Sequence, residues 1–249
     1  MDDCIEHPDA IRYSIRKKLK VPILINSLKP QKHEKILDVA CGGGHILEKI
    51  SERCDFAVGI DLLYENAKEA GKKNKYMVVG DATALPFKDG VFDKILGSEI
   101  IEHISEDQRF VNELARTTKK EGDVILTTLT TNPTFSLIWL KKRLGINVES
   151  EFGHVRGGYA NRELRARLEN ADLRYEQTTY YDYFFAELAW IITALGRIIR
   201  PTKKDWKSGE DQSTLDKSLM FKLYQRTFFL IHWFALLDKL IPKKVGHHI

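Results

Sequence analysis

The chain has 249 residues, 43% of them hydrophobic, which is enough to bury a substantial core in one large domain with insertions. The 39 basic and 35 acidic residues leave a net charge of +4, a small excess that does not indicate nucleic-acid binding. Three scattered cysteines, without an apolar segment after a basic start, argue against a disulfide framework and secretion, so we expect a cytoplasmic protein.

The first predicted element is an amphipathic helix over residues 9–28. Its apolar residues recur at helical spacing with basic residues between them, and Pro22 is expected to interrupt it. We expect this helix to cover one side of the core.

A glycine-rich stretch, KILDVACGGGHILE at residues 35–48, follows this helix. A short apolar run with β-branched residues predicts a strand, three glycines predict a tight turn, and the next apolar residues return at helical spacing. Glycine adopts positive φ without steric strain and lets a ligand approach the backbone. The stretch therefore predicts a ligand-holding loop, and the alternative is an ordinary turn between a strand and a helix.

Three further strands are predicted after the glycine loop. They are FAVGID at residues 56–61, YMVVGD at 76–81 and a run within 93–104, with a helix over 62–74 between the first two. Doubly wound folds place a ribose-binding carboxylate about twenty residues beyond the glycines, and Asp61 stands there. Acids at the ends of parallel strands gather at the ligand-binding edge, although a single one is more often a turn residue.

The segments LDVACGGG, VGID, GDATALPFKDGVFD and ILGSEIIEHI follow one another between residue 35 and about residue 130. In this order the sequence resembles the class I S-adenosylmethionine-dependent methyltransferases. The resemblance implies an α/β fold with a doubly wound, mostly parallel, seven-stranded Rossmann-like sheet and helices on both of its faces. It also implies S-adenosyl-L-methionine as the cofactor.

The resemblance assigns roles to individual positions. It implies that Asp38 and the three glycines line the methionine and ribose side, that Asp61 holds the ribose, and that Asp81 with Ala82 meets the adenine. Ala40 departs from the glycine that the family often has. The implied cofactor-binding residues are Asp38, Ala40, Gly42, Gly43, Gly44, Asp61, Leu62, Asp81, Ala82 and Ser98.

A nicotinamide dinucleotide site is disfavoured. In the GxGxxG pattern of those proteins the third glycine allows close packing of the helix against the strand. Leu47 stands at that position here, so this packing is not encoded.

The rest of the core is predicted as a helix from Ser105 to near Gly122 and a strand ended by Asn132 and Pro133. An amphipathic segment at residues 135–145, a loop at 152–159, a helix at 161–171 and a strand-like run at 173–184 follow.

Two histidines are candidate general bases, because a hydroxyl acceptor must lose a proton and imidazole titrates near neutral pH. His103 follows the fourth strand, and His154 lies in the loop with Arg156 and Tyr159. His103 has an alternative structural role at a helix end, and the loop has an alternative as a plain surface loop. No metal ligand is required.

The C-terminal part, residues 184–249, is predicted as an apolar helical insertion with a last short strand, beside a methyltransferase core with its N-terminal helix at 1–183. Residues 227–237 are apolar around much of a helix but shorter than the about 20 residues that a membrane span needs. They either pack on the core, line a lipophilic site or contact a membrane surface, since basic residues flank them.

These observations predict a methyltransferase that acts by in-line transfer on a small-molecule or lipid-like acceptor, in the cytoplasm or peripheral to a membrane. The alternative is a non-catalytic cofactor-binding or membrane-associated accessory protein.

Overall fold

The protein is described from a computed structural model, which covers residues 15–131 and 155–181 and a few helical residues beyond them, namely 188, 226, 230, 232–233 and 235–237. The chain divides into two compact units. One unit comprises residues 1–20, 133–146 and 180–247, and the other comprises 21–132, 147–179 and 248–249. The predicted division at residue 183 stays a prediction.

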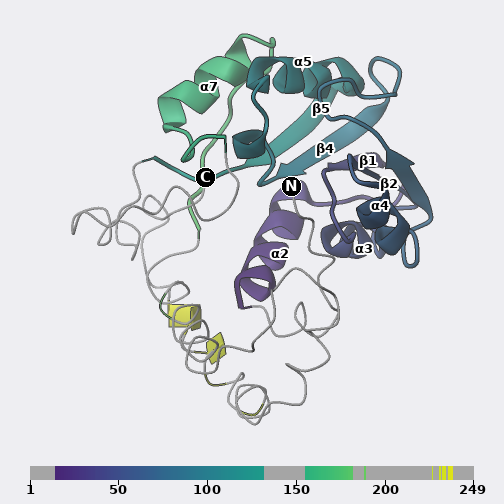
Figure 1. Cartoon of the computed structure of the whole chain (residues 1–249), viewed down its shortest axis with the longest axis vertical. Helices are drawn as coiled ribbons and strands as arrows, with labels where there is room; N and C mark the ends of the chain where they lie inside the picture. The colour runs from purple at the N-terminus through teal and green to yellow at the C-terminus, as the bar shows by residue number, and fades with distance from the viewer. Residues whose placement is uncertain are drawn as a thin grey trace, which may run out of the picture. The chain divides into compact units, whose positions relative to one another are not determined.

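The second unit is built on one sheet of parallel strands, drawn in Figure 1. The strands lie in the order β3-β2-β1-β4-β5, so β1 occupies the centre and the chain moves outward first to one side and then to the other. The strands are β1 Lys35–Val39, β2 Phe56–Asp61, β3 Tyr76–Val79, β4 Phe92–Ser98 and β5 Thr118–Thr127. This order confirms the doubly wound α/β class.

The predicted number of seven strands is not reached in the described residues, which contain five. The run at 173–184 accounts for part of the difference, because residues 173–180 form no regular strand. Charged and polar residues recur through this run, so it offers few positions for a buried strand.

The strands carry apolar side chains that are buried on both faces, as a parallel sheet requires. In β1, Ile36, Leu37 and Val39 are fully buried. The helices α3 His45–Ser51 and α4 Tyr64–Ala70 contact β2, and α5 Asp107–Thr117 contacts β5 (Figure 1). A short 3₁₀ helix, η1 Ile101–His103, follows β4, and α7 Asn161–Glu169 contacts α5.

The N-terminal helix α2 spans Ile15–Leu28 and contains Pro22 without a break, so the predicted interruption is wrong. Proline removes one backbone donor from a helix. The buried residues Leu24 and Leu28 belong to the same apolar cluster as Leu47 of α3. Burial of this face stabilises the part of the helix that follows the proline.

The helix α5 ends five residues earlier than predicted, and Gly122 lies inside β5 rather than at a helix end. A Cβ at Gly122 would lie 2.6 Å from the carbonyl oxygen of Asp93 on the neighbouring strand. The pairing of β4 with β5 also shifts register between Phe92 and Lys94. Gly122 therefore marks a close approach of two strands, a common role of glycine in a sheet.

In the first unit, the described residues 226, 230, 232–233 and 235 are helical. The side chains of Leu230 and Trp233 are 64% and 63% exposed, and Ala235 is buried. No helix in the described part of the chain is long and apolar enough to cross a membrane. The predicted amphipathic segment at 135–145 and the last short strand lie outside the described residues.

Candidate active site

The turn between β1 and α3 contains three residues with positive φ, namely Ala40 at 56°, Gly42 at 52° and Gly44 at 75°. A Cβ at Gly44 would lie 2.6 Å from Nδ2 of Asn74 and 2.7 Å from Cβ of Ala70. Gly44 is therefore required for packing inside the protein.

Gly42 differs from Gly44, because a Cβ placed there would meet no atom within 4 Å. The backbone at Gly42 thus borders open space rather than the core. Its neighbour Gly43 also lies in the turn, where a Cβ would meet only the side chain of His45, at 3.3 Å. The loop therefore presents backbone that a ligand can approach closely.

Asp61, at the end of β2, is buried and fastens this loop. Its Oδ2 accepts a hydrogen bond of 2.8 Å from the backbone N–H of Gly42. Its Oδ1 accepts one of 3.0 Å from Leu63 N–H and one of 3.1 Å from Asn66 Nδ2. A carboxylate has about four acceptor positions, so these three bonds leave capacity on Oδ2 for a ligand hydroxyl.

Two carboxylates, Asp38 and Asp61, make the electrostatic potential at the loop negative. Asp38 is buried in β1, one strand from Asp61. Burial raises the pKa of the Cys41 thiol far above its ordinary value, and the charges of Asp38 and Asp61 raise it further. Cys41 therefore stays protonated and weakly reactive.

The end of β3 provides the predicted adenine side. Oδ1 of Asp81 accepts hydrogen bonds of 2.8 Å from both the N–H and the hydroxyl of Thr83, and these bonds lower the pKa of Asp81. Ala82 lies within this turn. Leu62 follows Asp61 and is 59% exposed, so an apolar side chain stands beside the polar groups. Val79 pairs with Asp61 in the sheet, which places both predicted segments at one edge.

The end of β4 provides the third side. The Ser98 hydroxyl lies 3.2 Å from the Thr127 hydroxyl, and Glu99 follows with φ 55°. His103 closes η1 and is half-buried, with its backbone N–H donating to Ile100 O at 2.9 Å. The histidine thus lies beyond the same strand end as Ser98.

His154 lies outside the described residues, but its neighbour in the chain is described. The backbone N–H of Val155 donates to the carbonyl of Glu102 at 3.0 Å. Glu102 precedes His103 directly, so the two segments that carry the candidate bases are hydrogen-bonded to each other.

Arg156 and Tyr159 fasten this loop from within. Tyr159 is fully buried, and its hydroxyl donates to Asp107 Oδ2 at 2.9 Å. Arg156 pairs with Glu163 at 2.7 Å, and its guanidinium lies 4.4 Å from the centre of the Tyr159 ring. Both side chains are thus held by contacts within the described part of the loop and with α5 and α7.

Two polar residues near the site were not singled out from the sequence. Asn66 donates a hydrogen bond to Asp61, and its place five residues after Asp61, near the start of the following helix, could have indicated this contact from the sequence. Glu102 is buried and accepts a 2.9 Å hydrogen bond from the Thr128 hydroxyl, a pairing between distant segments that no local pattern reveals. Within the described ranges, no group of three or more His, Cys, Asp or Glu side chains could hold a metal ion.

These features define a Rossmann-like domain whose ligand-binding edge lies at the carboxyl ends of its strands. The YcgJ protein from Bacillus subtilis has the same fold, with a TM-score of 0.55 at 23% identity over 64% of this chain and 70% of that chain.

Residues 37–126 match the family model of the methyltransferase domain. A ubiquinone biosynthesis O-methyltransferase of Pelagibacter ubique (strain HTCC1062) is 36% identical over 129 residues, or 49% of this chain and 53% of that protein. The norajmaline N-methyltransferase of Rauvolfia serpentina is 32% identical over 108 residues, or 39% of this chain and 36% of that protein. The chain spans about half the length of these relatives or less.

Residues 37–126 therefore form a methyltransferase domain of the class I S-adenosylmethionine-dependent type, for which S-adenosyl-L-methionine is the cofactor. The family predicted from the four sequence segments is thereby confirmed.

Proposed function

We propose that this chain binds S-adenosyl-L-methionine at the carboxyl edge of the sheet and transfers its methyl group to a small organic acceptor. The observation that carries the proposal is the 2.8 Å bond from Gly42 N–H to Asp61, which holds the loop while leaving open space at Gly42. The same carboxylate keeps an acceptor position for a ribose hydroxyl.

The charge and shape of the site fit this cofactor. When bound, S-adenosyl-L-methionine supplies an activated methyl group on a positively charged sulfonium. Asp38 and Asp61 provide negative charge on the methionine and ribose side. Leu62 offers exposed apolar surface beside Asp61, against which a flat base can pack.

The protein's main task is to align the acceptor, because in-line displacement depends on holding the reacting atoms in the correct geometry. For a hydroxyl acceptor, His103 or His154 would take the proton. The hydrogen bond between Val155 and Glu102 supports a shared role, since it ties the two histidine-bearing segments together.

The names of the two relatives support a small organic acceptor, one through ubiquinone biosynthesis and the other through norajmaline. A lipophilic acceptor, or contact with a membrane surface, is supported by the exposed side chains of Leu230 and Trp233. Burying apolar surface contributes about 25 cal/mol per Å², so these two side chains favour association with an apolar ligand.

The proposal is tested by titration calorimetry with S-adenosyl-L-homocysteine, followed by assays of methyl transfer to phenolic, amine and lipid acceptors. Binding together with a methylated product supports the enzyme. Binding without any product across these acceptors would favour the non-catalytic alternative. The Trp233→Ser variant examines the lipophilic acceptor, because it should lose turnover of a lipid acceptor while its melting temperature stays close to that of the parent protein.

A further inference from the structure

The segment between β3 and β4, residues 80–91, includes Asp81 and Ala82 near its start and forms no helix or strand. Its backbone N–H and C=O groups therefore lack the partners that a regular element provides, and buried ones must bond to other groups. Its start is tied to the sheet, where Gly80 N–H donates to Asp61 O at 3.0 Å.

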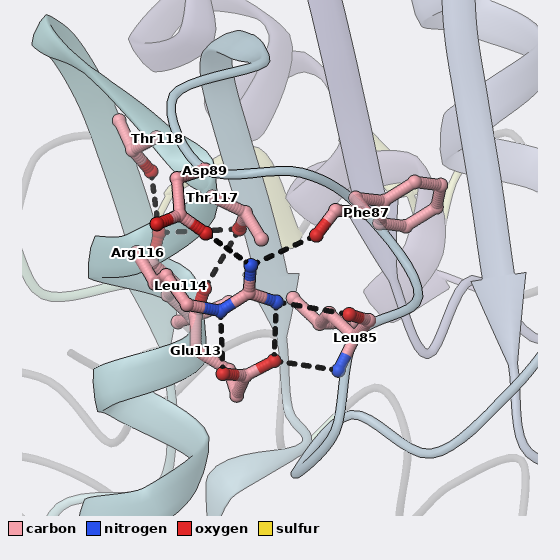
Figure 2. A network of polar contacts seen from close by, with 8 residues as sticks. All are labelled: Leu85, Phe87, Asp89, Glu113, Leu114, Arg116, Thr117 and Thr118. Atoms are coloured by element: carbon pink, nitrogen blue, oxygen red, sulfur yellow. Dashed lines mark hydrogen bonds and ion pairs between the residues drawn. The ribbon is translucent and has the colours of Figure 1, made fainter.

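Two side chains of α5 bond the middle of this segment, as Figure 2 shows. Glu113 Oε2 accepts a 2.7 Å hydrogen bond from Leu85 N–H. Arg116 Nη2 donates to Leu85 O at 2.9 Å, and its Nη1 donates to Phe87 O at 2.8 Å. Both polar groups of the buried residue Leu85 are thus satisfied by one pair of side chains.

The same two side chains also bond each other in a two-point arrangement. Arg116 Nε donates to Glu113 Oε1 at 2.7 Å, and Nη2 donates to Glu113 Oε2 at 2.8 Å. A guanidinium and a carboxylate joined at two points are planar and rigid, and lysine cannot reproduce this geometry. We call Glu113 and Arg116 the clamp.

The end of the segment is held by backbone bonds to the last turn of α5. Gly90 N–H donates to Arg116 O and Val91 N–H to Thr117 O, each at 2.9 Å. Arg116 also pairs with Asp89 at 2.6 Å, but the Asp89 side chain is 80% exposed, so solvent weakens this ion pair. The clamp therefore holds the segment at Leu85, between the backbone attachments at Gly80 and at Gly90.

We infer that the clamp positions the adenine-side residues Asp81 and Ala82, and that it thereby sets how well the protein distinguishes adenine from other bases. The inference rests on the proposed function. A hydrogen-bonding group must be held in place to reject a base that lacks its partner. With the clamp broken, the segment 80–91 keeps its backbone attachments at Gly80 and at Gly90 but loses the fixed point at Leu85 between them.

The experiment compares two probes, S-adenosyl-L-homocysteine and S-inosyl-L-homocysteine, which differ in the amino group of the base. The ratio of their dissociation constants is measured by calorimetry for the parent protein, Arg116→Lys and Glu113→Gln. We expect the parent to prefer the adenosyl compound and both variants to reduce this preference at least fivefold. An adenosyl preference within twofold of the parent's, in folded Arg116→Lys or Glu113→Gln, would overturn the inference.

Two controls separate positioning from simple loss of stability. Val111→Ala removes a buried side chain from α5 without touching the clamp, so it should lower the melting temperature and leave the ratio unchanged. Asp89→Ala should change the ratio less than twofold. A ratio that falls equally in Val111→Ala would show that stability alone is responsible and would overturn the inference. If the parent bound neither probe, the proposed function would fail, and this inference with it.

Discussion

The two ends of the parallel strands, here called the amino edge and the carboxyl edge of the sheet, hold their acidic side chains in different ways. At the amino edge, Asp93 bonds Lys35 N–H at 2.8 Å and pairs with Lys119 at 2.6 Å, and Glu34 pairs with Lys94 at 2.9 Å. At the carboxyl edge, Asp61 receives its hydrogen bonds from neutral amide groups.

The difference separates a structural use of acids from a ligand-binding one. The lysines neutralise the carboxylates at the amino edge, so that edge gains stability and presents little net field. Asp38 and Asp61 act together on Cys41, so negative charge persists next to the open backbone of Gly42. Acids at the amino edge thus stabilise the fold, whereas in the proposed function those at the carboxyl edge bind a cationic cofactor.

The largest expected effect comes from Gly44→Ala. The new Cβ would approach Asn74 and Ala70 to 2.6 and 2.7 Å in a backbone with φ 75°. Overpacking and the left-handed conformation together should lower the free energy of unfolding by about 3 kcal/mol, measured by chemical denaturation. An equally stable variant would show that the turn is not constrained from inside.

Asp61→Asn should act mainly on binding. It removes a charged acceptor of Gly42 N–H and of the ribose, and hydrogen bonds to charged groups contribute about 1.5 to 3 kcal/mol. The affinity for S-adenosyl-L-homocysteine, measured by calorimetry, should fall accordingly. Asp93→Asn is the matched control at the amino edge and should leave that affinity unchanged. Equal losses in both variants would contradict the distinction between the edges.

The amino edge should respond to acid. Burial would raise the pKa of Asp93, but the bonds from Lys119 and Lys35 outweigh it and hold the pKa below its ordinary value. A lowered folded-state pKa means that stability is present above the unfolded-state value of about 3.9 and is lost as pH falls through the folded-state value.

We therefore expect the free energy of unfolding of the parent protein to fall between pH 6 and pH 3 by an amount that Asp93→Asn does not lose. Because the pair of Asp93 and Lys119 is partly exposed, this amount should be about 1 kcal/mol or less. A variant that loses stability as steeply as the parent would argue against a contribution from this pair.

The smallest expected effect is a gain in stability from Ala40→Gly. Ala40 holds φ 56°, where a Cβ is strained, so Ala40→Gly relieves strain while adding freedom to the unfolded chain. The balance should stabilise the protein by about 0.5 kcal/mol, seen as a higher denaturation midpoint. A lower midpoint would mean that the Ala40 methyl group contributes packing that outweighs the strain.

The strands β1 and β2 and the glycine turn could be predicted because their pattern is local, an apolar run that ends at Gly42 or Asp61. The end of α5 could not be predicted, because Gly122 suggested a helix end. Its actual role is to allow the close approach of Asp93 from the neighbouring strand. Likewise, the buried position of Tyr159 depends on Asp107, which is distant in sequence. Contacts between distant segments leave no periodic signal, so the sequence indicated the ligand-binding edge better than the groups that support it.

In the proposed function the open space at Gly42 belongs to the cofactor, and Gly42→Ala tests this assignment most directly. A Cβ there meets nothing in the protein, so the variant should fold with only a modest loss of stability from its φ of 52°. Titration with S-adenosyl-L-homocysteine should then show an affinity at least about tenfold weaker than that of the parent protein, a difference of about 1.4 kcal/mol. A folded Gly42→Ala variant with the parent's affinity would contradict the account.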